Sequence, residues 1–257
     1  MSLLRENDAP AVPNKSRQRL RRALYEVVLV VVLFLAYKVG RLAADGHVGE
    51  ALTNADNVWN LERLLHLPSE YAFQQAVISH EWLIKAANCY YAYVHFPATA
   101  AALIWLYLRR PEHYVPTRRL LAWLTAASLV VHLLFPLAPP RMLAAVGMVD
   151  TGRLFGPAVY GSPSADTLTN QYAAMPSLHV GWALAVAIAL IAATKGRYRW
   201  LWLAHPTITL LIVVVTGNHY WLDAIVAAAL LGLVAAVLSH RAPAAALTIP
   251  KPRVGES

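Results

Sequence analysis

Four ionisable side chains stand beside long apolar stretches of this sequence. Arg141 lies in FPLAPPRML, His179 in AAMPSLHVGWA, and His219 and Asp223 in TGNHYWLDAIVA. Such groups are costly in or near a membrane unless they are paired or functional. We expect all four at the same ends of three different helices, where they would converge on one site.

The spacing of these residues predicts a specific chemistry. His219 and Asp223 are four residues apart, and such a pair shares one face of a helix. A carboxylate that accepts a hydrogen bond from one ring nitrogen leaves the other nitrogen free and more basic. His219 is therefore a candidate nucleophile, His179 a candidate general acid, and Arg141 a clamp for phosphate oxygens. Together they predict phosphoryl transfer through a phosphohistidine, without metal or cofactor.

Further polar residues are candidates for supporting roles. Ser177 and Asn218 are expected to donate hydrogen bonds to the phosphate, with turn or capping roles as the alternative. Tyr90, Tyr93 and His95 form a polar stripe that could line a headgroup pocket, with aromatic packing as the alternative.

Other interpretations of the central residues stay open. A membrane histidine often serves packing, and a His–Asp pair can hold two helices together. Two histidines and one aspartate are also possible metal ligands, although the single Cys89 excludes a cysteine cluster.

Composition predicts a membrane protein. The chain of 257 residues is 58% apolar and only 14% charged, too apolar for an ordinary soluble domain. Apolar runs near the 20 residues that cross a bilayer predict an all-α, polytopic fold with six spans. These spans are residues 23–40, 82–108, 120–136, 178–194, 200–215 and 221–239. The stretch 43–80 is amphipathic and broken at Pro68, which predicts helices that lie on the membrane surface or cap the bundle.

Charge distribution predicts domains and topology. Residues 1–22 are expected to form a basic cytoplasmic tail, 23–240 a membrane-embedded catalytic domain, and 241–257 a second cytoplasmic tail. If both termini are cytoplasmic, sixteen Lys and Arg residues fall on the inner side and six on the outer side. Because basic loops stay inside, we expect a cell-membrane protein whose site faces the extracytoplasmic side. The net charge of +8 is then explained by basic residues that orient the membrane spans, and not by binding of nucleic acid.

Three segments resemble a known family. PPRM, PSLHVGWA and GNHYWLD are similar to the motifs Lys-x6-Arg-Pro, Pro-Ser-Gly-His and Ser-Arg-x5-His-x3-Asp of the type-2 phosphatidic acid phosphatase superfamily. The resemblance covers roughly residues 80–240. It implies a six-helix membrane fold that cleaves or transfers phosphate esters without metal. It also implies His219 as nucleophile, Asp223 as its partner, His179 as acid and Arg141 as the first motif's arginine.

The chain departs from those motifs at three positions. Leu134, Met142 and Val213 stand where the family has Lys, Pro and Arg. The pattern, with YYAYVHFP at 90–97 and APPR at 138–141, resembles inositol phosphorylceramide and sphingomyelin synthases, which move a phospho-headgroup to a lipid alcohol. A site with fewer cations suits a phosphodiester, which carries one negative charge, better than a monoester, which carries nearly two.

Transfer from a phospholipid to a lipid alcohol is therefore slightly favoured. One alternative is a lipid phosphate phosphatase that hydrolyses phosphatidic acid or polyprenyl phosphates, with water as acceptor. The second alternative is a non-catalytic lipid transporter or binding protein.

Overall fold

A computed structural model describes residues 47–159 and 171–240, together with six single residues between 24 and 35. Within these residues the chain is helical, with one isolated parallel bridge between Leu137 and Ala173 and no strands. The α-helices are α2 (Val48–Leu64), α3 (Glu70–Ile78), α4 (Glu81–Cys89), α5 (His95–Arg109), α6 (Pro111–Leu134), α7 (Thr151–Phe155), α8 (Leu178–Ala193), α9 (Ala204–Val215) and α10 (Trp221–His240). Shorter turns are the π-helix η1 (Tyr90–Val94) and the 3₁₀ helices η2 (Pro140–Met142), η3 (Ala144–Val146) and η4 (Arg197–Leu203).

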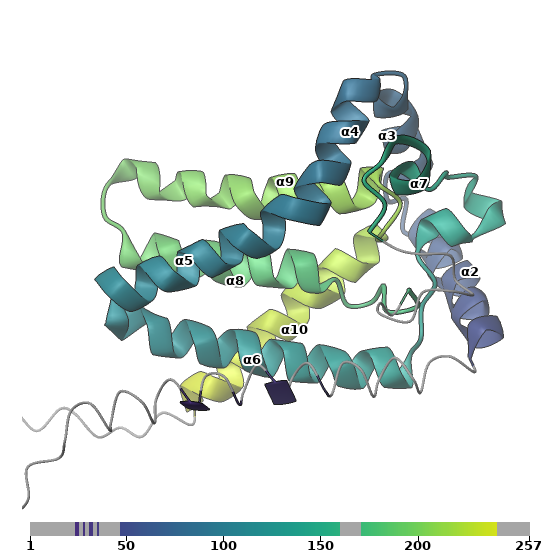
Figure 1. Cartoon of the computed structure of the whole chain (residues 1–257). Coiled ribbons are helices and arrows are strands. Elements are labelled where there is room, and N and C mark those ends of the chain that lie inside the picture. The colour runs from purple at the N-terminus through teal and green to yellow at the C-terminus, as the bar shows by residue number, and fades with distance from the viewer. Residues whose placement is uncertain are drawn as a thin grey trace, which may run out of the picture.

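Helix α8 is the centre of the bundle. It packs against α5, α6, α9 and α10, which surround it in Figure 1. The small side chains Ala183, Ala185 and Ala187 are almost completely buried, so neighbouring backbones approach closely. A Cβ at Gly181 would lie 3.1 Å from a methyl group of Leu124, so a larger residue here would require the Leu124 side chain to shift.

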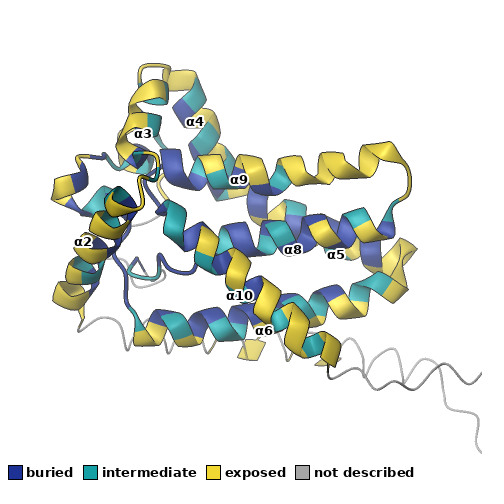
Figure 2. Ribbon diagram, turned by 180° about the vertical axis from the view of Figure 1, so that it is seen from behind, coloured by how far each residue is buried: buried dark blue, intermediate teal, exposed yellow. Residues whose placement is uncertain are grey.

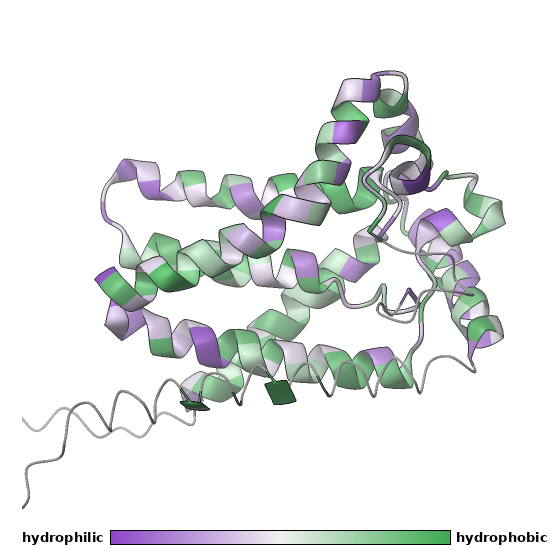
Figure 3. Cartoon of the chain, in the orientation of Figure 1, coloured by the Kyte–Doolittle hydropathy of each residue, from purple (hydrophilic) through white to green (hydrophobic). Residues whose placement is uncertain are grey.

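The outer surface of the bundle is apolar. Large side chains such as Ile104, Trp123, Ile188 and Leu233 are each more than half exposed. Figures 2 and 3 show exposed and hydrophobic positions along the outward faces of the long helices. An apolar surface of this extent is typical of a protein whose surrounding solvent is lipid.

Within the described residues, fewer helices than predicted are long and apolar enough to span a membrane. Three helices in the described part of the chain are long and apolar enough: Glu81–Arg109, Arg197–Val215 and Trp221–His240. The predicted fourth span, α8, has only 16 residues and is a shorter apolar helix. The predicted third span lies in α6, whose first half carries Glu112, Arg118 and Arg119. The predicted first span, 23–40, lies almost wholly outside the described residues.

The stretch before the bundle forms two helices, α2 and α3, on either side of Pro68. Helix α3 packs against α9, and α2 contacts α10. Their position on the membrane surface stays a prediction. Both predicted tails, 1–22 and 241–257, lie outside the described residues.

Candidate active site

Three segments distant in sequence meet at the end of the bundle where α8 and α10 begin. The amide of Arg141 in η2 donates to the carbonyl of Gly217 at 3.1 Å, and the amide of Ser177 donates to the carbonyl of Asp223 at 3.1 Å. Gly217 has φ +69°, and a Cβ there would lie 3.0 Å from the Cβ of Arg141. Only glycine accepts both the left-handed backbone and this close approach. The predicted convergence of the three motifs is therefore present in the structure.

His219 is held by two oxygen acceptors. Its Nδ1 lies 2.8 Å from the carbonyl oxygen of Ala174 and 3.1 Å from Oδ2 of Asp223. A backbone carbonyl can only accept, so Nδ1 carries the proton and Nε2 of the neutral ring holds a free lone pair. Sequence reasoning identified the carboxylate partner but missed the carbonyl, because no side-chain pattern marks a backbone acceptor.

The charge state of His219 suits a nucleophile. The ring is only 6% exposed. Burial first, and then the positive charge of Arg141, lower the pKa of His219 to about 4, against the hydrogen bond to Ala174. At neutral pH the ring is therefore uncharged and its free nitrogen is available to attack.

His179 faces His219 from the first turn of α8. The two ring centroids are 6.0 Å apart, close enough for both rings to reach one phosphorus centre. Aromatic side chains of η1 and α5 surround the His179 ring. Its centroid lies 4.5 Å from that of Tyr91, 4.8 Å from that of His95 and 5.5 Å from that of Phe96. These contacts fix its orientation toward His219.

Arg141 is the cation of the site, and its side chain is only 3% exposed. Its Nη1 donates a hydrogen bond to Oδ1 of Asn218. Its Nε lies 3.5 Å from Oδ2 of Asp150, which also lies 3.5 Å from Nε of Arg153. Asp150 was not identified from the sequence, because it lies in the long loop with no regular spacing to the motifs. It offsets part of the Arg141 charge and lines a small polar pocket with Asn218 and Thr216.

Two neighbouring residues have structural partners. Ser177 is the N-cap of α8, and its hydroxyl accepts from the amide of Val180 at 3.4 Å. This geometry corresponds to the capping alternative. His132 of α6 lies 3.2 Å from the carbonyl oxygen of Pro176, so α6 is tied to the loop that presents His179.

Two of the three residues predicted for a headgroup pocket, Tyr90 and His95, both contact His205, and Tyr93 lies apart from them. The hydroxyl of Tyr90 lies 2.8 Å from Nδ1 of His205, Tyr93 is 64% exposed, and His95 is buried against His179. The π-helix between α4 and α5 explains the divergence, because its wider turn changes the directions in which successive side chains point. Residues 90 and 93 thus do not share the face that an ordinary helix would give them.

Comparisons with known proteins support a family assignment. A family model described as the PAP2 superfamily matches residues 56–237, which include every motif of the site. No curated protein and no solved structure matches the chain.

Proposed function

Because the chain belongs to the PAP2 superfamily, whose members cleave or transfer phosphoesters, we propose that it acts on a membrane phospholipid through a phosphohistidine at His219. The observation that carries this proposal is the arrangement of His219, Asp223 and His179. A neutral imidazole is held by a carboxylate and faces a second imidazole at 6.0 Å. Phosphoryl transfer needs mainly such positioning and charge stabilisation.

The proposed reaction has two steps. Nε2 of His219 attacks phosphorus, a P–N bond forms, and the bond to the leaving oxygen breaks as His179, which takes up a proton when the anionic phosphate ester binds beside it, gives that oxygen the proton. Asp223 stabilises the positive charge that develops on the His219 ring. In the second step an acceptor hydroxyl gives its proton to His179, its oxygen attacks phosphorus, and the P–N bond breaks. Arg141 would hold the phosphate oxygens during both steps, with Asn218 and Ser177 as supporting residues.

Transfer to a lipid alcohol is the favoured second step. Leu134 and Val213 stand where the family motifs have a lysine and an arginine, and Asp150 offsets part of the charge of the remaining motif cation, Arg141. A phosphodiester carries one negative charge, whereas a monoester carries nearly two. The low positive charge of this site supports a diester donor.

A lipid panel with product identification tests this proposal. Purified protein receives labelled phospholipids with and without a lipid alcohol, and products are identified by mass spectrometry. Transfer predicts a new phospho-headgroup lipid that depends on the alcohol. Release of free phosphate or free phospho-headgroup, with no new lipid in the presence of alcohol, would contradict transfer and support hydrolysis. No turnover of any phospholipid would support a transporter or binding protein.

Metal independence is a separate prediction. All proposed steps use side chains of this chain, so turnover is expected to remain within about twofold of the untreated rate in excess chelator. The measurement is the initial rate before and after dialysis against EDTA. Loss of activity that a divalent ion restores would overturn this expectation.

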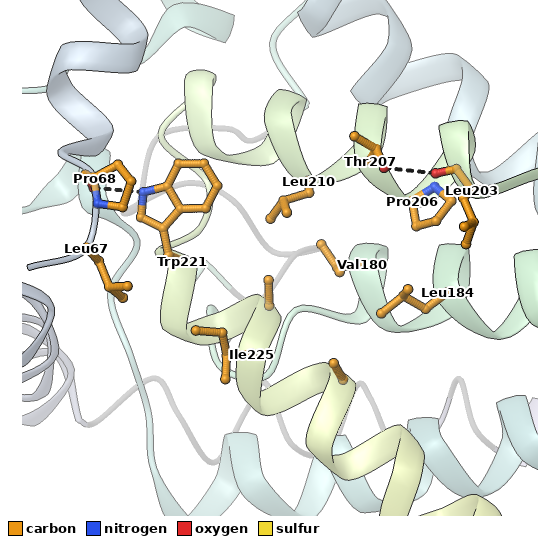
Figure 4. Close-up of a pocket in the computed structure, with 12 residues that line it drawn as sticks. Leu67, Pro68, Val180, Leu184, Leu203, Pro206, Thr207, Leu210, Trp221 and Ile225 are labelled. Carbon is orange, nitrogen blue, oxygen red and sulfur yellow. Dashed lines mark hydrogen bonds between the residues drawn. The ribbon is translucent and has the colours of Figure 1, made fainter. Parts of the chain in front are cut away.

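An apolar groove beside the site supports a lipid substrate. The groove has a volume of about 400 Å³ and runs between α8, α9 and α10. Leu184, Leu210, Trp221 and Ile225 line it, as Figure 4 shows. It begins at Trp221, two residues after His219, and its lining residues Val180 and Ala224 directly follow His179 and Asp223 in sequence. We propose that it holds an acyl chain of the lipid whose phosphate lies at His219.

Filling this groove is expected to weaken binding of long-chain lipids. Ala228 is exposed and lines the groove. In Ala228→Phe the larger ring would occupy part of the space proposed for the acyl chain. KM for a long-chain lipid should therefore rise about tenfold, since a misfit of this kind in an apolar pocket costs about 1–3 kcal/mol. Initial rates with long-chain and short-chain substrates provide the comparison. KM for a short-chain, water-soluble analogue should stay unchanged. Ala229→Phe, on the same helix but outside the groove, is the matched control. Equal effects of both variants would argue against the groove.

The proposed orientation places the site at the extracytoplasmic face. Arg110 donates from Nε to the carbonyl of Ala193 at 3.1 Å, so the α5–α6 corner and the carboxyl end of α8 lie at one end of the bundle. The basic residues Lys195, Arg197 and Arg199 follow at that end, opposite the α8 terminus that carries His179. This distribution agrees with both termini and the basic turns being cytoplasmic.

A further inference from the structure

The amino terminus of α10 is capped by a residue from another helix. The helix begins at Trp221, and the residue before it, Tyr220, has no short polar side chain to accept from the first amides. Oε1 of Glu62 in α2 instead accepts from the amide of Leu222 at 2.7 Å. An N-cap side chain normally satisfies an amide at this position, so Glu62 performs that role from 160 residues away in sequence.

The same helix terminus holds the proposed catalytic pair. Asp223, the third residue of α10, accepts from the amide of Tyr220 at 2.9 Å and from His219 at 3.1 Å. Asp223 therefore supplies one half of a capping box and Glu62 replaces the missing other half. Any shift of this first turn moves the carboxylate that orients His219.

A cluster of contacts fixes Glu62 in place. Glu62 and Glu70 are both completely buried. Nη2 of Arg63 lies 3.1 Å from Oε2 of Glu70 and 3.8 Å from Oε2 of Glu62. The carbonyl of Pro68 accepts from Arg63 at 3.1 Å and from the indole of Trp221 at 2.8 Å. The α2–α3 region therefore contacts the start of α10 twice: Glu62 binds the backbone amide of Leu222, and the carbonyl of Pro68 binds the side chain of Trp221.

We propose that Glu62 is a positioning residue, which caps α10 from α2 and thereby holds His219 and Asp223 in the geometry needed for attack on phosphorus. This inference rests on the proposed function for its kinetic consequence. Its structural consequence, the protection of the first turn of α10, is independent of any activity.

The protonation state of Glu62 gives the cap a pH limit. Burial, followed by the hydrogen bond and charge of Glu70, raises the pKa of Glu62 to about 9, against the amide of Leu222. The groups that face it are Glu70, Arg63, Asp223 and the phenol of Tyr220, whose own pKa is raised by burial and by these carboxylates. Near neutral pH Glu62 is therefore uncharged. Above about pH 9 its negative charge would repel Glu70 and Asp223 and weaken the cap.

The sign of the stability change follows from the raised pKa. In the folded chain Glu62 keeps its proton up to about pH 9. In the unfolded chain it loses that proton near its ordinary pKa of 4.5. The contribution of this group to stability is full below 4.5 and is lost as the pH rises through about 9. Glutamine mimics the protonated acid, so Glu62→Gln should remove this dependence while keeping the acceptor for Leu222.

The test compares Glu62→Gln, Glu62→Ala and the control Glu50→Ala, an exposed acid on the same helix. At neutral pH, Glu62→Ala should lower kcat about 10²-fold with little change in KM, because a small misplacement of reacting groups has an effect of that size. Glu62→Gln should stay near wild type. The ratio of wild-type to Glu62→Gln turnover should fall as the pH rises through about 9.

Hydrogen–deuterium exchange of the peptide containing residues 220–223 gives the readout that is independent of activity. Exchange should be faster in Glu62→Ala than in wild type and unchanged in Glu62→Gln and Glu50→Ala. Unchanged exchange in Glu62→Ala would overturn the cap, whether or not the protein turns over a phospholipid. Faster exchange with unchanged kcat would overturn the positioning role alone. Absence of turnover in wild type, with the expected exchange pattern, would overturn the proposed function and not the cap.

Discussion

Replacing His219 with alanine is expected to lower turnover by at least about 10⁴-fold, because removal of a nucleophile usually eliminates most of an enzyme's acceleration. Nε2 is the only ring atom with a free lone pair, since Nδ1 faces two acceptors. The measurement is the initial rate of product formation from the preferred phospholipid. Insertion into membranes and unfolding temperature should change little.

The control for this variant is His240→Ala, which removes an exposed histidine from the far end of the same helix. Its turnover should equal that of wild type. Turnover of His219→Ala within about tenfold of wild type would contradict a nucleophilic role, because a positioning defect alone costs about 10²-fold or less.

Replacing Asp223 with asparagine is expected to lower kcat about 10²–10³-fold. In a serine-protease triad the equivalent change costs about 10⁴-fold, largely through the wrong histidine tautomer. Here the carbonyl of Ala174 also accepts from Nδ1 of His219 and keeps the tautomer when the carboxylate charge is lost. The remaining loss reflects weaker stabilisation of the charged ring. Steady-state kcat and KM measure it.

A second variant separates charge from structure. In Asp223→Asn the amide oxygen of the new side chain can still accept from the backbone amide of Tyr220, so this variant should unfold at nearly the wild-type temperature. Asp223→Ala also removes the cap and should lose about 0.5–2 kcal/mol of stability. Wild-type kcat in Asp223→Asn would show that the carboxylate charge has no part in the reaction.

The core of the site could be predicted because its residues have regular positions. His219 and Asp223 share a helix face through their spacing, and His179 and Arg141 mark the ends of neighbouring apolar segments. The alternation of apolar helices and turns then requires these ends to meet at one side of the bundle. The PAP2 superfamily match over residues 56–237 agrees with the resemblance carried by these motifs.

Other features could not be predicted because they depend on tertiary contacts. The Ala174 carbonyl, the Asp150–Arg141 ion pair and the Glu62 cap join residues between about 10 and 160 positions apart with no repeating pattern. The π-helix at 90–94 changed the directions of Tyr90 and Tyr93, which a regular helix would have placed together. Five of the six predicted spans fall in the described part of the chain, and three helices there are long and apolar enough to cross a membrane, since α8 is short and α6 carries charges in its first half.

Trapping a covalent adduct on His219 is the sharpest test of the proposed phosphohistidine. Protein is mixed with labelled donor lipid without acceptor, quenched in alkali where phosphohistidine persists, digested and analysed by mass spectrometry. We expect a phospho-headgroup or phosphate adduct on the His219 peptide, and this adduct should disappear when a lipid alcohol is added. Turnover in the same samples with an adduct on another residue, or with none at any time point, would contradict it.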